Sequence, residues 1–312
     1  MSSSSLDTVL EQGFRAWTRN LKISVPFILS LLVVGLIWTA YAIILALFVA
    51  IPAFYTAQLD LGVMGMHTLY TFLPYIEPYL IPVIASFVLV MIISMLVQSF
   101  FTSGAIGMSR SAAITGHASY EDMVNYGKLF AVRYFFLQII YYIVILVGAV
   151  FTIPGILRLM GLQTYTPDTV IPNITPLLGG FGVWFIYSVI VTLLLSVMYY
   201  ALVVDDRGIF SSVLASIKFF FANKAAVIIL WVIIITVMVV LNMVDIVTMQ
   251  FEYLATLWSA VTFIISVAVI PAVLTVWWTF LYIGKTGWTI HGTTENENGK
   301  EKGKEEKETV VE

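Results

Sequence analysis

The most constraining feature of the sequence is a series of long apolar runs that contain almost no charge. Residues 25–51 hold no charged side chain, and about 20 apolar residues are enough for a helix to cross the hydrocarbon core of a bilayer. Of all 312 residues, 60% are hydrophobic and only 11% are charged, against about 25% charged residues in a soluble domain. The chain is therefore predicted to be an all-α integral membrane protein.

Six apolar runs of this kind follow one another along the chain. Their spacing predicts transmembrane helices over residues 25–51, 79–103, 134–153, 177–204, 225–244 and 253–283. The sixth helix is expected to kink near Pro271, because proline removes a backbone hydrogen bond inside a helix. Consecutive helices are joined in pairs, which predicts three hairpins.

A short amphipathic segment precedes each predicted hairpin. The first covers residues 6–21, where apolar side chains recur at helical spacing and charged side chains lie on the opposite face. The other two cover residues 119–130, which begin with a capping-box pattern at Ser119–Asp122, and residues 209–222. We expect all three segments to lie as helices in the cytoplasmic interface of the membrane.

An amphipathic segment followed by a hairpin thus occurs three times, which indicates an internal repeat. The predicted units cover residues 6–118, 119–208 and 209–291, and together they form one membrane domain over residues 1–291. Residues 292–312 hold seven Glu and four Lys, and so polar a segment is expected to be a disordered cytoplasmic tail. The tail accounts for the net charge of −3, so the membrane domain presents no basic face for nucleic acid.

The positive charges are distributed unevenly over the two sides of this topology. Of the 15 Lys and Arg residues, all except Arg158 fall at the N-terminus, in the connections after the second and fourth helices, or after the sixth helix. Loops rich in Lys and Arg stay in the cytoplasm. We therefore expect a multi-pass protein of the cell membrane with both termini in the cytoplasm.

Charged residues of the cytoplasmic segments are the candidate contacts for lipid headgroups or for a partner protein. The set comprises Arg15, Arg19, Lys128, Arg133, Asp205, Asp206, Arg207 and Lys218. Asp205, Asp206 and Arg207 form a compact group directly after the fourth helix. The favoured interpretation of that group is structural, a helix cap with an ion pair, because surface charges commonly contribute no more than this.

Small and polar residues recur at every fourth position of two predicted helices. The second helix and its extension carry Ser99, Ser103, Gly107 and Ser111, and the fourth carries Ser188, Thr192, Ser196 and Tyr200. Such stripes let helices approach closely or form hydrogen bonds across their interface. We favour helix packing near the centre of the bundle, with a polar path through the membrane as the alternative.

The sequence predicts no catalytic, cofactor-binding or metal-binding residues. Cysteine is absent, and the spacing of His67, His117 and His291 does not suggest a zinc site. No phosphate loop, nucleophile elbow or Ser-His-Asp pattern occurs. No charged residue lies in the middle of a predicted helix, which argues against a proton- or sodium-driven carrier.

Two short stretches resemble a group of prokaryotic six-helix membrane families. They are Gly104-Ala105-Ile106-Gly107 with Thr115-Gly116, read as a small-residue turn after the second helix, and Val203-Val204-Asp205-Asp206-Arg207-Gly208 after the fourth. The group includes the membrane domain that accompanies glycerophosphodiester phosphodiesterases, where a similar acidic-Arg-Gly turn leads into a basic amphipathic segment. The resemblance implies the six-helix fold over most of residues 6–290. It does not imply the hydrolase activity, because the sequence has no segment for the hydrolase domain.

These observations favour a non-enzymatic scaffold or accessory subunit that engages membrane lipid or a protein partner through its amphipathic helices. A bare channel would not require three such segments. The alternative is a passive channel or uncoupled permease for a small solute, which needs a continuous polar stripe through the bilayer. A lipid-modifying enzyme is the third hypothesis, and no catalytic constellation supports it.

Overall fold

The computed structural model describes residues 6–52, 77–161, 167–288 and 290. Over these residues the chain is almost entirely helical and contains no β-strand. Six helical segments are long and apolar enough to cross a membrane: Leu21–Ala50, Glu77–Thr115, Tyr120–Met160, Ile171–Val204, Lys224–Thr248 and Tyr253–Thr286. The prediction of an all-α fold with six membrane-spanning helices is therefore confirmed. The predicted tail, His67 and His291 lie outside the described residues.

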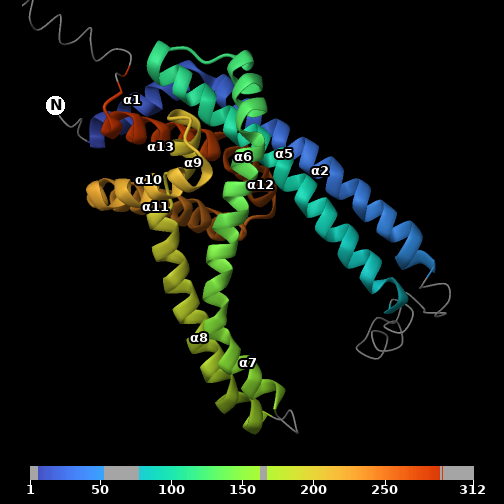
Figure 1. Ribbon diagram of the computed structural model, residues 1–312. Helices are drawn as coiled ribbons and strands as arrows, with labels where there is room; N and C mark the ends of the chain where they lie inside the picture. Colours follow the sequence, from blue (N-terminus) through green and yellow to red (C-terminus); the bar gives the residue numbers. More distant parts are fainter. Residues whose placement is uncertain (1–5, 53–76, 162–166, 289, 291–312) are drawn as a thin grey trace, which may run out of the picture.

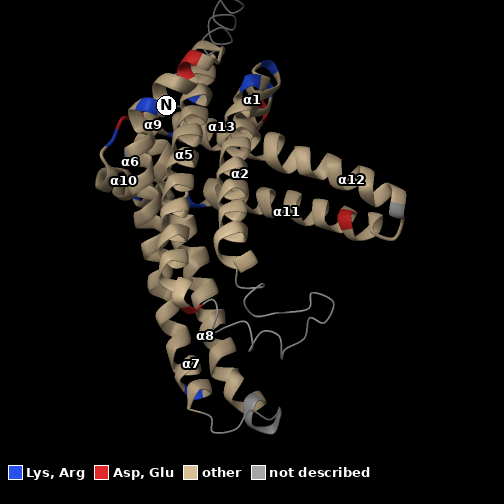
Figure 2. Cartoon of the chain, turned by 90° about the vertical axis from the view of Figure 1, so that its right-hand side faces the viewer, with Lys and Arg blue, Asp and Glu red and all other residues tan. Residues whose placement is uncertain are grey.

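The long helices form three pairs that diverge from one end of the molecule, the first two seen in Figure 1 and the third in Figure 2. The first pair is α2 (Val25–Leu45), extended by a π-helical stretch (Ala46–Ala50), and α5 (Leu80–Thr115). The second pair is α6 (Tyr120–Val147) and α8 (Pro167–Leu194), with a 3₁₀ stretch (Gly148–Thr152) and α7 (Ile153–Met160) between them. The third pair is α11 (Lys224–Thr248) and α12 (Glu252–Ile264), which points away from the second pair at a wide angle (Figure 2).

The three pairs meet in a hub, which consists of α1, α9, α10, α13 and the adjoining turns of α5 and α6. The four helices that belong to the hub entirely are α1 (Leu6–Arg19), α9 (Met198–Val204), α10 (Ile209–Ala222) and α13 (Ile270–Thr286). Many of the fully buried large side chains lie here, among them Ile106, Met108, Leu202, Phe280 and Ile283. The packing that holds the pairs together is therefore concentrated in the hub.

The three pairs themselves expose long apolar surfaces. Leu36 of α2, Phe185 of α8 and Leu257 of α12 keep 70%, 69% and 68% of their surface accessible. Helices satisfy their backbone hydrogen bonds internally, so surfaces of this kind are stable in hydrocarbon. The chain thus combines a packed hub with three helix pairs whose apolar surfaces suit a lipid environment.

The turn from α5 to α6 is determined locally by its sequence. Gly116 ends α5 in the left-handed conformation, with φ of 81°, which glycine adopts without steric cost. Ser119 then caps α6, because its hydroxyl accepts the Asp122 backbone N–H while the Asp122 carboxylate accepts the Ser119 N–H. The predicted capping box is confirmed.

Asn20 and Asn223 each follow a hub helix and begin a long apolar segment. Their backbones are alike, with φ and ψ of −128° and 56° at Asn20 and −130° and 34° at Asn223. Each side-chain amide donates to the carbonyl four residues earlier, at 2.9 Å for Asn20 and 3.2 Å for Asn223. Asn20 also donates to the Gly116 carbonyl and accepts the Ala118 N–H, so it fastens the start of the first pair to the α5–α6 turn.

Two boundaries in the first half of the chain differ from the prediction. Residues 119–130 do not form a separate helix; they include the first turns of α6, because no helix-breaking residue separates Phe130 from Tyr134. Residues 104–107, expected as a turn, continue α5. A Cβ on Gly104 would lie 2.6 Å from the Met123 carbonyl oxygen, so this glycine permits close approach to α6 instead of a bend.

The fourth and sixth predicted helices are both interrupted. Residues 195–197 separate α8 from α9, and Ser216 of α10 donates to the Leu194 carbonyl and accepts the Val197 N–H there. A side chain of another helix thus replaces lost helical bonds, which the local sequence does not reveal. In the sixth helix, a π-helical stretch (Ile265–Val269) ends two residues before Pro271 and confirms the predicted irregularity.

Candidate functional site

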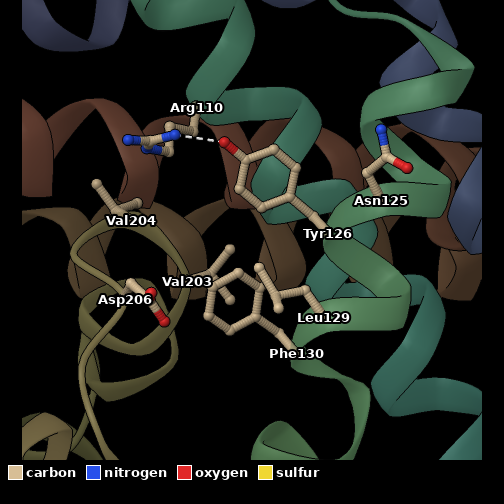
Figure 3. A pocket seen from close by; sticks show the side chains of 8 residues that line it. All are labelled: Arg110, Asn125, Tyr126, Leu129, Phe130, Val203, Val204 and Asp206. Carbon is tan, nitrogen blue, oxygen red and sulfur yellow. Dashed lines mark hydrogen bonds between the residues drawn. The ribbon is translucent and has the colours of Figure 1, made fainter.

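A pocket of about 350 Å³ opens in the hub between α5, α6 and the link from α9 to α10. This volume lies within the range of small-ligand sites. The side chains that line it are Arg110, Asn125, Tyr126, Leu129, Phe130, Val203, Val204 and Asp206 (Figure 3). One wall is apolar, and charged side chains lie at two separate places, which suits an amphiphilic ligand better than a purely apolar one.

Glycines on α5 and α6 allow the close approach that builds this pocket. A Cβ on Gly107 would lie 2.2 Å from Cγ of Tyr126, and a Cβ on Gly127 would lie 2.8 Å from the Phe100 ring. The Tyr126 ring therefore lies directly across Gly107, and its hydroxyl accepts a hydrogen bond from Nη1 of Arg110 (Figure 3). Arg110 follows Gly107 by one helical turn, so the same helix face that admits the ring also carries the arginine.

Arg110 is a half-buried cation with neutral neighbours. Its guanidinium lies 5.8 Å from the Tyr126 ring centroid and 5.2 Å from that of Trp288. Its Nε is buried and has no hydrogen-bond partner among the described residues. In the described part of the chain, no Asp or Glu forms an ion pair with it. Aromatic faces attract a guanidinium but do not neutralise its charge, so the pocket retains a positive end.

Asp205 holds the link between α9 and α10 against α13. Its carboxylate accepts hydrogen bonds from the Tyr282 hydroxyl at 2.6 Å, from Nε of Arg207 at 3.0 Å and from Nε1 of Trp288 at 3.2 Å. The side chain is only 13% exposed and also forms an ion pair with Arg207. The group contains the predicted ion pair, but the N-cap of α10 is Gly208, and no side chain caps that helix. Asp205 instead fastens the link to Tyr282 of α13 and to Trp288.

Asp206 lines the pocket at the end away from Arg110 (Figure 3). It has a φ of 50°, a conformation that aspartate tolerates better than most residues. Its carboxylate accepts a hydrogen bond at 2.8 Å from Arg133, which lies over the Phe130 ring. Arg133 therefore offsets the Asp206 charge, and Arg110 is left without a counterion among the described residues.

The other predicted contact residues are not brought to the pocket. Arg15 forms an exposed ion pair with Glu11 at 2.6 Å within α1. Arg19, Lys128 and Lys218 are exposed on α1, α6 and α10. Exposed charges of this kind contribute little to stability, and their part in recognition stays a prediction.

The two predicted stripes both form bonds to α6. On α5, Ser99 donates to Gln138 of α6 at 3.2 Å, and the buried Ser103 donates to the Ser99 carbonyl. On α8, Thr192 bonds with the Tyr141 hydroxyl of α6 at 3.0 Å. The remaining stripe residues of the fourth helix differ: Ser188 is half-buried, and the buried Ser196 hydroxyl has no partner within the described residues. Ser99 of α5 and Thr192 of α8 thus share α6 as a neighbour, and helix packing stays the predicted role of the two stripes.

Arg110 and Tyr126 were not among the residues predicted from the sequence. The available signal was position: Arg110 is a charged residue one turn after Gly107, on the helix face of the small-residue stripe. The sequence does not reveal its partners, because Tyr126 and Trp288 reach Arg110 only in the folded hub. No group of three or more His, Asp and Glu residues capable of holding a metal ion occurs in the described parts of the chain.

The fold and the pocket define a six-helix, membrane-type protein with a ligand-sized cavity in its hub. No protein-family model matches the chain, and no curated protein or solved structure is significantly similar to it. The resemblance to the membrane domain that accompanies glycerophosphodiester phosphodiesterases therefore stays a prediction.

Proposed function

We propose that the protein is a non-enzymatic membrane scaffold or accessory subunit whose hub engages a membrane lipid or a partner protein. The observation that carries this proposal is the hub pocket, where Arg110 lies beside an apolar wall and forms no ion pair with a described Asp or Glu. A half-buried cation without a counterion is costly unless a ligand supplies the opposite charge.

The distribution of charge supports a cytoplasmic position of the hub. Most Lys and Arg residues in the described chain lie on hub elements, whereas α7, which carries Arg158, lies at the far tip of the second pair (Figure 2). By the positive-inside rule, the hub faces the cytoplasm and the far tips of the pairs face outward. In this orientation both termini are cytoplasmic, and the pocket lies at the level of the inner headgroups of the cell membrane.

The interfacial helix α1 supports lipid engagement at a second place. Its Gly13 lies against Trp277 of α13, whose indole N–H donates to the Leu10 carbonyl at 3.2 Å. Beside this contact, an almost entirely apolar crevice of about 230 Å³ runs between Phe14 of α1, α11 and the start of α13. A crevice of this composition beside a transmembrane helix suits a lipid acyl chain.

The passive channel is less well supported. A pore requires helices that converge around one axis over the thickness of the bilayer, whereas the three pairs diverge from the hub (Figures 1 and 2). Several stripe hydroxyls are also used in bonds to neighbouring helices or to their own backbone. These groups would have to be released before they could line a polar path.

Native mass spectrometry of the protein, extracted gently from its own membrane, tests the proposal. We expect either a retained lipid or a partner protein in fixed stoichiometry. A protein that emerges alone and lipid-free, and that conducts a small solute in liposomes, would contradict the scaffold and favour the channel.

A further inference from the structure

The electrostatics of the hub pocket indicate which kind of ligand it accepts. Arg110 provides a positive end, because its partners are the Tyr126 hydroxyl and two aromatic rings, all neutral. Asp206 at the other end is paired with Arg133 at 2.8 Å. Counting Arg110, Arg133 and Asp206 together, the pocket and its immediate partner carry one net positive charge, so an anionic ligand group is favoured.

We propose that this pocket binds a phosphate group, held by the Arg110 guanidinium. The inference rests on the proposed function and names the ligand class for the same site. A guanidinium presents its donors in a planar fork that matches two oxygens of one phosphate. Among the described residues the buried Nε has no hydrogen-bond partner, so the protein does not satisfy all the donors of this guanidinium.

The surroundings of Arg110 hold the guanidinium in place before the ligand arrives. Tyr126 accepts from Nη1, and its ring is fixed across Gly107. Trp288 lies under the guanidinium at 5.2 Å and is itself bonded to Asp205 at 3.2 Å. An arginine that is already ordered loses less conformational entropy on binding, so the phosphate end of the pocket is prepared in the free protein.

The apolar wall indicates that the phosphate is part of an amphiphile. Leu129, Phe130 and Val203 line the pocket together, and Leu129 is 58% exposed. A phospholipid headgroup would place its phosphate at Arg110 and its glycerol and first acyl carbons along this wall. A soluble phosphate compound shares the same charged group, so the test must separate the two sources.

The test uses the full-length protein, stripped of lipid in mild detergent and examined by native mass spectrometry. The probes are phosphatidylglycerol, diacylglycerol with the same acyl chains, and inorganic phosphate alone. We expect the wild-type protein to retain phosphatidylglycerol and not diacylglycerol. Arg110→Gln should weaken retention by about tenfold or more, as for loss of a charged hydrogen bond. Lys224→Gln, which removes an exposed charge stacked on Phe221 away from the pocket, should bind as the wild type does.

Arg110→Lys is the second variant, because it keeps the positive charge but loses the planar set of guanidinium donors. It should bind phosphatidylglycerol with an affinity between those of the wild type and Arg110→Gln. If Arg110→Gln does not fold, Arg110→Lys provides the binding comparison, and its thermal unfolding shows that it is folded. Displacement of phosphatidylglycerol by millimolar inorganic phosphate would support the phosphate site and identify a soluble ligand as its source.

Two results would overturn the inference and leave the proposed function standing. Equal retention of diacylglycerol and phosphatidylglycerol would show that the phosphate is not recognised. Unchanged binding in a folded Arg110→Gln protein would show that the lipid lies elsewhere. If the wild-type protein retained neither lipid nor a protein partner, the proposed function itself would fail.

Discussion

The ring of Tyr126 lies directly across the Cα of Gly107, so closely that a Cβ there would meet the ring at 2.2–2.5 Å. This contact between α6 and α5 determines two things at once. It sets how closely the two helices approach, and it directs the tyrosine hydroxyl toward Arg110. Packing and the geometry of the pocket therefore depend on the same glycine.

Gly107→Ala is expected to destabilise the hub by about 1–3 kcal/mol, because the new methyl group would contact the base of the Tyr126 side chain, which cannot rotate away without moving the whole ring. Thermal unfolding in lipid nanodiscs measures this. Gly35→Ala is the matched control, since nothing lies within 4 Å of a Cβ on that glycine of α2. Equal stability of the two variants would refute the close α5–α6 contact.

Asp205→Asn should be much more harmful than Asp206→Asn. Asp205 is half-buried and accepts from three donors, so Asp205→Asn weakens charged hydrogen bonds at a cost of about 1–3 kcal/mol. Asp206 forms one pair whose two side chains are 36% and 65% exposed, so its change should stay below about 1 kcal/mol. Asparagine tolerates the positive φ of residue 206, so backbone strain does not confuse the comparison. Thermal shifts of similar size would contradict the role of Asp205 in fastening α13.

Asn20→Ala should cost more stability than Asn223→Ala, although both residues end a hub helix in the same backbone conformation. Each variant loses the bond to the carbonyl four residues earlier. Only Asn20→Ala also leaves the Gly116 carbonyl and the Ala118 N–H without their partner, and unsatisfied buried groups cost about 1–3 kcal/mol each. Chemical denaturation of both variants measures which one has the lower free energy of unfolding. If the Asn20→Ala protein were the more stable, Asn20 would not fasten the first pair to the α5–α6 turn.

Single cysteines at residues 128 and 158 should report opposite sides of the membrane. The natural sequence has no cysteine, so Lys128→Cys and Arg158→Cys each provide one exposed thiol, on α6 of the hub and on α7. A membrane-impermeant maleimide applied to intact cells should label only residue 158, and residue 128 should react after the cells are opened. Labelling of residue 128 alone in intact cells would show that the topology is the reverse of the one proposed.

The number of long helices could be predicted because apolar length is a local property of the sequence. The same holds for the capping box at Ser119 and the irregularity before Pro271, each of which depends on neighbouring residues. Gly104 and Gly107 show where local reasoning fails. Glycine allows both a turn and a close helix contact, and only the position of Met123 and Tyr126 on α6 decides between them.

The pocket could not be predicted because its parts are separated in the sequence. Arg110 and Tyr126 come from adjacent helices, while Trp288 follows α13 and reaches Arg110 only through the folded hub. The interruption at residues 195–197 is likewise set by Ser216 of α10. In both cases the deciding contact is tertiary, and the apolar pattern along one helix does not predict it.

The most direct measurement for the hub as a ligand-binding element is an experimental structure of the full chain in a lipid nanodisc containing phosphatidylglycerol. The account predicts density for a phosphate-bearing headgroup within hydrogen-bonding distance of the Arg110 guanidinium, with the attached chains along Leu129 and Val203. A pocket closed by the protein's own side chains, or an Arg110 paired with a carboxylate of this chain, would contradict it.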